Sequence, residues 1–270
     1  MSVIYPIAVI TFKEGIRNRS IYGISLLALA LFGFNLVIAN MTPRDVGKVA
    51  VDMALSTVSF AGLLLVLFVG INLMAKDLDK RTIYMVLSRP LSRAQYILGK
   101  FLGMCLLIIV TVAFLSVLAL LSILMLKLGY PDYFERFSWS LVALAMLLII
   151  AMLIVLSALS FLFASFSSTS FITLVLTMIA YIIGQSLTDV KALVESPQAA
   201  GLGVSPLTVN LVQAAYYIFP NLSFFDIKTQ AAHGIAVSPV YLALVLLYGA
   251  VYSGLTVALA SLIFRKKEFP

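Results

Sequence analysis

The chain has 270 residues, of which 63% are hydrophobic and only 11% are charged, and its formal net charge is +7. Soluble domains carry roughly 25% charged residues, so this composition excludes an ordinary soluble globular protein. The placement of the charges must then decide whether the positive balance reflects nucleic-acid binding or membrane topology.

An apolar stripe marks the first nineteen residues. Apolar side chains recur at helical spacing at Tyr5, Val9, Phe12 and Ile16, with charged residues beside them. This pattern predicts an N-terminal amphipathic helix, within residues 1–19, that lies in the membrane interface. The alternative is a simple cytoplasmic extension of the first membrane span.

Stretches without charged residues predict six membrane spans. Each is long enough, at 1.5 Å per residue and with some tilt, for a hydrocarbon core of about 30 Å. The predicted spans are residues 20–40, 53–75, 101–126, 141–166, 171–187 and 239–264. The predicted fold class is therefore an all-α polytopic membrane protein, with residues 1–270 forming a single transmembrane domain.

The fourth and fifth spans come from one run of 52 residues, Phe137 to Thr188, that holds no Asp, Glu, Lys, Arg or His. As a single helix it would be roughly 78 Å long, more than twice the hydrocarbon core. Backbone amides in lipid must be satisfied inside helices or closed barrels, and the run lacks the alternation of barrel strands. A helical hairpin is predicted, with its turn at the polar cluster 167–170.

The loop between the second and third spans, residues 76–100, has an ordered design. Asp77 and Asp79 suit the first turn of a short helix, because acidic side chains stabilise helix N-termini. Pro90 ends that helix, and Ser92 with Gln95 forms a capping box that starts the next one. The loop is predicted to present a rigid, charged helical element.

The segment 188–238, before the last span, is interrupted by prolines and glycines. Its longest clean apolar stretch, Leu207–Phe219, would be only about 20 Å long as a helix. It is predicted to be interfacial or re-entrant, so small extracytoplasmic helices are expected before the last span.

Six spans place both termini on the same side of the membrane. That side carries twelve of the eighteen Lys and Arg residues, and the opposite loops carry six. By the positive-inside rule both termini should be cytoplasmic. The positive balance is then explained by topology, and no nucleic acid is expected as a partner.

The sequence offers no catalytic, metal or cofactor site. The six spans contain no titratable carboxylate, Lys or His, which counts against proton relays and intramembrane hydrolases. His233 has no Cys or second His nearby and is interpreted as a solvated loop residue. The chain lacks the phosphate-binding pattern G-x-x-x-x-G-K-[ST], so any ATP would be bound by another chain. Its single cysteine, Cys105, excludes an intramolecular disulfide.

A few uncharged polar side chains remain within the spans. Interhelical hydrogen bonds are expected for Asn35, Asn72, Ser157, Ser160 and Gln185. The small-residue pairs Gly99/Gly103 and Gly249/Ser253 are expected to be helix-packing contacts.

Four segments of the chain resemble the permeases of ABC transporters, in the type-2 exporter class that includes the NosY-like branch. The loop at 79–93, followed by 96–103, is similar to the loop between the second and third helices of those permeases. Residues 12–19 resemble the N-terminal elbow helix of those permeases. Residues 220–225 resemble the loop before their last helix, and residues 264–269 resemble their C-terminal end. Many of these permeases have Glu-x-x-x-Gly-Thr where this chain has an Asp-Leu-Asp-Lys-Arg-Thr run at 77–82.

The resemblance implies six helices per subunit, a second permease subunit that is identical or paralogous, and two separate nucleotide-binding ATPase subunits. It implies that the chain lies in the cytoplasmic membrane of a prokaryote. It also implies that the chain is not an enzyme, since ATP would be hydrolysed by the partner ATPase subunits. A first coupling helix would lie within 76–97 and a second coupling contact at 167–170. The residues implied to couple to the ATPase are Asp77, Asp79, Lys80, Arg81, Thr82, Arg89, Arg93 and Ser168.

Two other functions are compatible with the sequence. A secondary carrier or channel would need no ATPase, although inverted repeats, which would favour it, are not evident between the two halves. A membrane scaffold in an assembly complex is the second alternative. A neighbouring gene for a soluble protein with a phosphate-binding loop would favour the transporter.

Overall fold

The computed structural model describes residues 4–41, 45–73, 92–135, 137–167, 169–194 and 206–266. Within these residues, six helices are long and apolar enough to cross a membrane. They are α2 (Arg19–Met41), α3 (Val46–Leu64, continued by η1), α6 (Arg93–Gly129), α7 (Trp139–Phe166), α8 (Ser170–Val194) and α12 (Pro239–Lys266). The prediction of an all-helical polytopic membrane protein with six long apolar helices is confirmed.

Shorter helices complete the fold. They are α1 (Ile4–Ile16), the π-helical continuation of α3 called η1 (Leu65–Gly70), η2 (Pro131–Phe134), α10 (Pro206–Ile218), η3 (Leu222–Phe225) and α11 (Lys228–His233). Three of them, α10, η3 and α11, lie between α8 and α12. The apolar stretch predicted to be interfacial or re-entrant therefore falls on α10.

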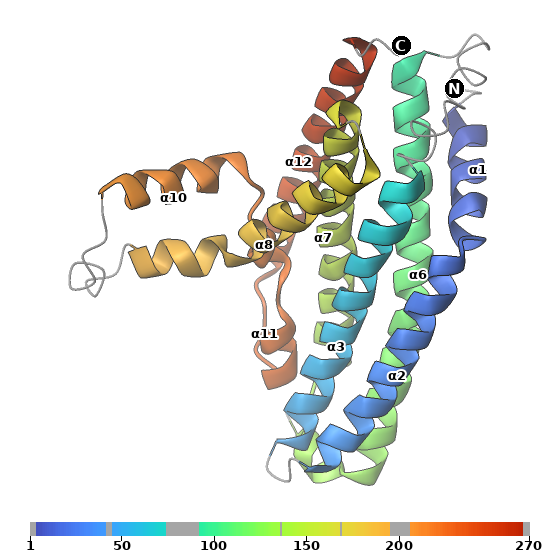
Figure 1. Ribbon diagram of the computed structural model, residues 1–270. Coiled ribbons are helices and arrows are strands. Elements are labelled where there is room, and N and C mark those ends of the chain that lie inside the picture. Colours follow the sequence, from blue (N-terminus) through green and yellow to red (C-terminus); the bar gives the residue numbers. More distant parts are fainter. Residues whose placement is uncertain are drawn as a thin grey trace.

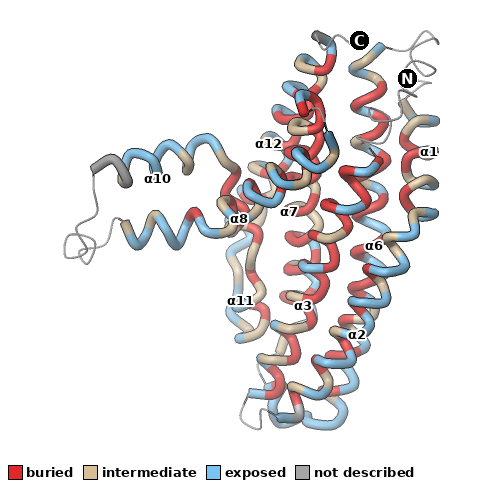
Figure 2. Tube along the Cα trace, in the orientation of Figure 1, coloured by how far each residue is buried: buried red, intermediate tan, exposed pale blue. Residues whose placement is uncertain are grey.

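α3 and α7 form the centre of the bundle. In their most apolar windows 78% and 67% of the residues are buried, against 22–33% in the other four long helices. Figure 2 shows buried residues following α3 and α7, while α2 alternates between buried and exposed positions. The outer helices expose large apolar side chains such as Leu26, Phe114 and Leu255. Exposed apolar surface of this extent is expected where a protein contacts lipid.

α8 runs obliquely to the other long helices, and its C-terminal half projects from the bundle together with α10 (Figure 1). We call these two segments the α8–α10 arm. Near its base the Gln185 amide lies 3.8 Å from Met152 Sδ on α7, one of the interhelical contacts that the sequence predicts. Further out, the Lys191 ammonium lies 4.0 Å from the centre of the Tyr216 ring on α10. This cation–π contact holds the two helices of the arm together.

α6 is longer than the span predicted from its charge-free window. Its 37 residues correspond to about 55 Å, well beyond the thickness of the hydrocarbon core. The predicted span began after Lys100, but a charged residue ends an apolar window without ending a helix. The additional N-terminal turns carry Arg93, Tyr96 and Lys100, and they form the site described next.

Candidate functional site

α6 begins at a capping box. The Ser92 hydroxyl accepts a hydrogen bond from the Gln95 backbone N–H at 3.2 Å, and the Gln95 side chain accepts one from the Ser92 backbone N–H at 3.1 Å. Two N–H groups that a helix start leaves without partners are thereby satisfied. The capping box predicted from the sequence is confirmed, and it fixes the residue at which the helix starts.

Arg93 joins the start of α6 to the end of α12. Its guanidinium donates to the carbonyl oxygens of Phe264 and Arg265 at 3.2 and 3.1 Å. The last carbonyls of a helix lack intrahelical donors and attract cations, so this is a favourable place for an arginine. One turn along α6, Tyr96 stacks on the Phe264 ring with centroids 6.1 Å apart. Residues about 170 positions apart in sequence are therefore tied together.

Lys100 joins α6 to the end of α3. Its side chain is only 5% exposed, and its ammonium donates to the Leu73 carbonyl at 2.6 Å. The Tyr96 ring lies 5.6 Å from the same ammonium. Sequence reasoning counted Lys100 among the cations that set topology and missed this contact. One signal in the sequence could have indicated this contact. Lys100 directly precedes the apolar window of the third span, at a position where the same helix continues toward its capping box.

The bonds of Arg93 to α12 and of Lys100 to the Leu73 carbonyl fix the residues on either side of the segment 74–91. Leu73 is the last described residue before this loop, and Ser92 is the first after it. Seven of the eight predicted coupling residues lie outside the described residues: Asp77, Asp79, Lys80, Arg81, Thr82, Arg89 and Ser168. Arg93 is described, and its guanidinium binds α12. Its predicted role in coupling would therefore act through that link.

The second predicted contact region is the connection between α7 and α8. α7 ends at Phe166 and α8 begins at Ser170, at the position of the predicted turn. The Thr169 hydroxyl accepts from the Ile172 backbone N–H at 3.4 Å, as a residue at a helix start does. Ser167 is buried, and Ser168 lies outside the described residues.

α1 packs lengthwise along the first turns of α6 (Figure 1). A methyl group added to Gly103 would lie 2.6 Å from the Ala8 carbonyl oxygen and 2.6 Å from Thr11 Cβ. One added to Gly99 would lie 2.7 Å from Ile7 Cβ. The predicted packing role of these two glycines is confirmed, because only a residue without a side chain permits this approach.

The face of α1 that packs on α6 differs from the stripe seen in the sequence. The buried residues of α1 are Ala8, Thr11 and Gly15, whereas Tyr5 and Ile16 of the stripe are 74% and 40% exposed. The small side chains permit close packing, which leaves the larger apolar side chains available to lipid.

Polar side chains of the spans bond mostly within their own helix. Ser157, Ser160 and Asn72 each donate to a carbonyl three or four residues earlier, at 2.6–2.8 Å. The prediction of interhelical bonds is wrong for these three, because a short side chain reaches its own backbone first. It is right for Asn35, whose amide donates to the Ala50 carbonyl on α3 at 3.1 Å.

Side-chain hydrogen bonds hold the segment that leads from α10 into α12. The Asn221 side chain donates to the Thr188 hydroxyl on α8 at 2.9 Å, and its backbone N–H donates to the Tyr248 hydroxyl on α12 at 3.0 Å. The Tyr241 hydroxyl donates to the Phe224 carbonyl at 2.7 Å. These bonds connect η3 to both neighbouring long helices.

Candidate metal ligands are not clustered in the part of the chain that the structure describes. No group of three or more His, Cys, Asp or Glu side chains is placed to hold a metal there. His233 is exposed, with Nδ1 2.9 Å from the Thr229 carbonyl oxygen of its own helix. The contacts at the start of α6 link this helix to the ends of α3 and α12.

Comparison with known proteins shows the family to which the chain belongs. The family model described as "ABC-2 family transporter protein" matches residues 5–269, which is nearly the whole chain. A search of curated proteins found no match. Permeases of this family are typically non-catalytic membrane subunits that generally pair with ATPase subunits. The chain belongs to the ABC-2 family of transporter proteins, as an integral membrane permease.

Proposed function

We propose that this chain is the membrane subunit of an ATP-driven exporter. Two permease subunits, identical or paralogous, form the translocation path between them, and two separate ATPase subunits supply the energy. The family match over residues 5–269 carries this proposal. Within the family we assign the chain to the NosY-like branch, on the loop sequence 79–103.

The loop 76–91 is proposed to be the coupling element that contacts the ATPase. Both of its flanks are anchored, one by the Lys100–Leu73 bond and the other by the capping box and the bonds of Arg93 to α12. A force applied to the loop by closure of the ATPase would therefore reach α3, α6 and α12 together. Joint movement of packed helices is a rigid-body switch, which could open a path between two subunits.

The proposed sidedness places both termini, and the start of α6, in the cytoplasm of a prokaryote. Twelve of eighteen Lys and Arg residues fall on that side. The segment 188–238 would then lie at the outer side, where η3 and its hydrogen bonds to α8 and α12 would close the exit. The α8–α10 arm exposes Tyr217 (85%) and Ile218 (68%), and it is proposed to contact the second permease subunit.

Reversing two charges of the loop should separate the permease from its ATPase. The variant combines Asp79→Lys with Arg81→Asp. Loss of a charge cluster from an interface costs about 2–5 kcal/mol, or roughly 30-fold or more in affinity. Co-purification of a co-expressed ATPase with the tagged full chain measures the effect, and insertion into membranes should be unchanged.

The matched control reverses the exposed pair Asp45 and Lys48, whose charged atoms are 2.7 Å apart at the opposite end of the bundle. The hydrogen bond and charge of Lys48 lower the pKa of Asp45, so the pair exists as ions at neutral pH. The pair is exposed to solvent and lies far from the proposed coupling loop, so ATPase recovery should not change. Undiminished recovery with the loop variant, or equal losses in both variants, would refute the coupling role.

A reporter of membrane sidedness fused after Ser168 should behave as cytoplasmic. The charge-free run can reverse only at the 167–170 connection, and the proposed topology places this connection on the side of the termini. A reporter fused after Lys191 should give the opposite result. Extracytoplasmic activity of the first fusion would overturn the topology, whatever the outcome for the ATPase.

A further inference from the structure

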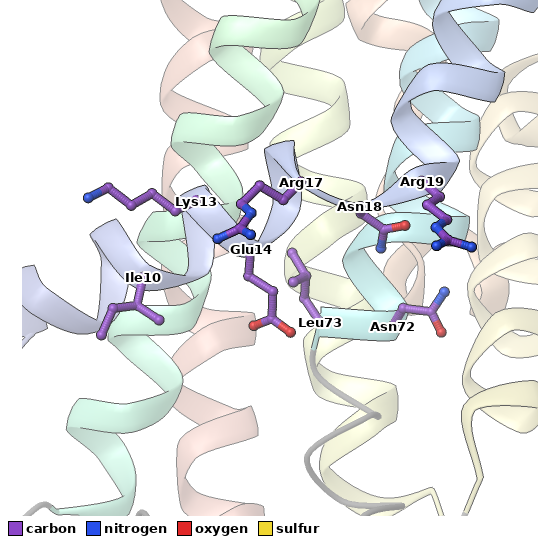
Figure 3. A pocket seen from close by; sticks show the side chains of 8 residues that line it. All are labelled: Ile10, Lys13, Glu14, Arg17, Asn18, Arg19, Asn72 and Leu73. Atoms are coloured by element: carbon purple, nitrogen blue, oxygen red, sulfur yellow. The ribbon is translucent and has the colours of Figure 1, made fainter.

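A cavity of about 610 Å³ lies where α1 turns into α2, beside the end of the α3 helix (Figure 3). Its polar lining comes from Lys13, Glu14, Arg17, Asn18 and Arg19, and Asn72 faces them from the last turn before the loop. The helix α1, which supplies part of this lining, packs against α6 at Gly99 and Gly103. The cavity shares one residue with the contacts described above, because Leu73, whose carbonyl accepts from Lys100, also lines it.

The charge of this cavity is positive. Figure 3 shows Arg17 beside Glu14, Arg19 and Asn18 extending toward Asn72, and Lys13 pointing away along α1. Within the part of the chain that the structure describes, no acidic side chain forms an ion pair with Arg17 or Arg19. Two guanidinium groups without a carboxylate ion-pair partner among the described residues are suited to bidentate binding of a phosphate.

The surroundings of the cavity are apolar on the side of the membrane. The charge-free span of α2 begins directly after Arg19, and its first turns expose Tyr22 (67%) and Leu26 (69%). Ile10, which lines the cavity from α1, is 64% exposed. A ligand whose phosphate occupies the cavity would therefore have apolar surface available beside it.

We propose that this cavity binds the phosphate of an anionic phospholipid, with Arg17 and Arg19 on the headgroup and the acyl chains along the exposed face of α2. Basic pockets between membrane helices on the cytoplasmic side recognise lipid headgroups through this combination of charge and apolar surface. Bound lipid would tie α1, α2 and the end of α3 together. This site is additional to the proposed export function and does not depend on the ATPase.

Titration of the purified full chain in detergent, followed by native mass spectrometry, tests the site. The probes are dioctanoyl phosphatidylglycerol, dioctanoyl phosphatidylcholine and inorganic phosphate. We expect the anionic lipid to bind at least about tenfold more tightly than the zwitterionic one. The double variant Arg17→Gln/Arg19→Gln should lose this preference, with affinity falling about tenfold or more for each guanidinium removed.

Two further variants make the test specific. Lys48→Gln/Lys228→Gln removes the same net charge far from the cavity and should leave binding unchanged. Arg17→Lys/Arg19→Lys keeps the charge, so it should fold even if the glutamine variant does not, and it should bind more weakly than the native chain because it lacks the planar guanidinium.

Three outcomes would overturn the proposal. The first is equal affinity of the native chain for the two lipids, and the second is an equal loss in the distant control variant. The third is displacement of the anionic lipid by inorganic phosphate at the same concentration, which would make a free anion, and not a lipid, the ligand.

Discussion

Replacing Gly103 by alanine should loosen α1 from α6 and destabilise the protein by about 1–3 kcal/mol, the usual cost of overfilling a packed contact. The new methyl group would meet the Ala8 carbonyl oxygen and Thr11 Cβ, both at 2.6 Å. One of these atoms belongs to the backbone and the other is the first side-chain atom, so neither can move away by a rotamer change. The whole helix α1 would have to shift.

The midpoint of thermal unfolding of the purified chain measures this effect. Gly23→Ala on α2 is the matched control, because no atom lies within 4 Å of a methyl group at that position. In an open helical position alanine is favoured over glycine by up to about 1 kcal/mol, so the control should be neutral or slightly stabilising. Equal effects of the two substitutions would show that α1 does not depend on the glycine contact.

Replacing Lys100 by methionine should release the end of α3 from α6. The Leu73 carbonyl is buried and would lose the donor that lies 2.6 Å away, at a cost of about 1–3 kcal/mol. Methionine fills a similar volume, so the loss reflects the hydrogen bond and not a cavity. Because Leu73 precedes the proposed coupling loop, stimulation of the partner ATPase should also fall.

Both thermal unfolding and ATPase stimulation should be measured for this variant. Lys127→Met at the other end of α6 is the control, since that ammonium lies 4.9 Å from the centre of the Phe137 ring and, among the described residues, donates to no buried carbonyl. This variant should lose only the cation–π contacts of Lys127 with Phe137 and Trp139, each about 0.5–1 kcal/mol, and it should still stimulate the ATPase. Full stability together with full stimulation in Lys100→Met would exclude the anchoring role.

The sequence by itself determined the class of this protein and several helix ends. The 52-residue run without charged residues cannot be one helix in a bilayer, so a hairpin with its connection near 167–170 follows from length alone. The capping box at Ser92 and Gln95 is a local pattern of side chains and backbone, and the structure has it where the sequence predicts it. Such features depend on neighbours within a few residues.

Only the tertiary structure decided which faces of the helices meet. In a soluble protein apolar periodicity marks the buried face, but lipid tails are as apolar as leucine, so buried and lipid-facing surfaces look alike in the sequence. The stripe through Tyr5 and Ile16 predicts a helix in the membrane interface, and it carries no information about which face of α1 packs on α6. The small residues Ala8, Thr11 and Gly15 form that face, because close packing of helices depends on shape more than on hydrophobicity.

The contacts at the start of α6 could not be predicted from the sequence, for a related reason. In the sequence, Arg93 and Lys100 are two of the Lys and Arg residues that indicate the membrane topology. Their charge does not indicate which distant carbonyl group each one binds. The partners of Arg93 lie about 170 residues later, at the end of α12. The last carbonyl groups of α12 have no intrahelical donors, because the helix ends there. Arg93 can reach them only when the folded bundle brings that helix end beside the start of α6.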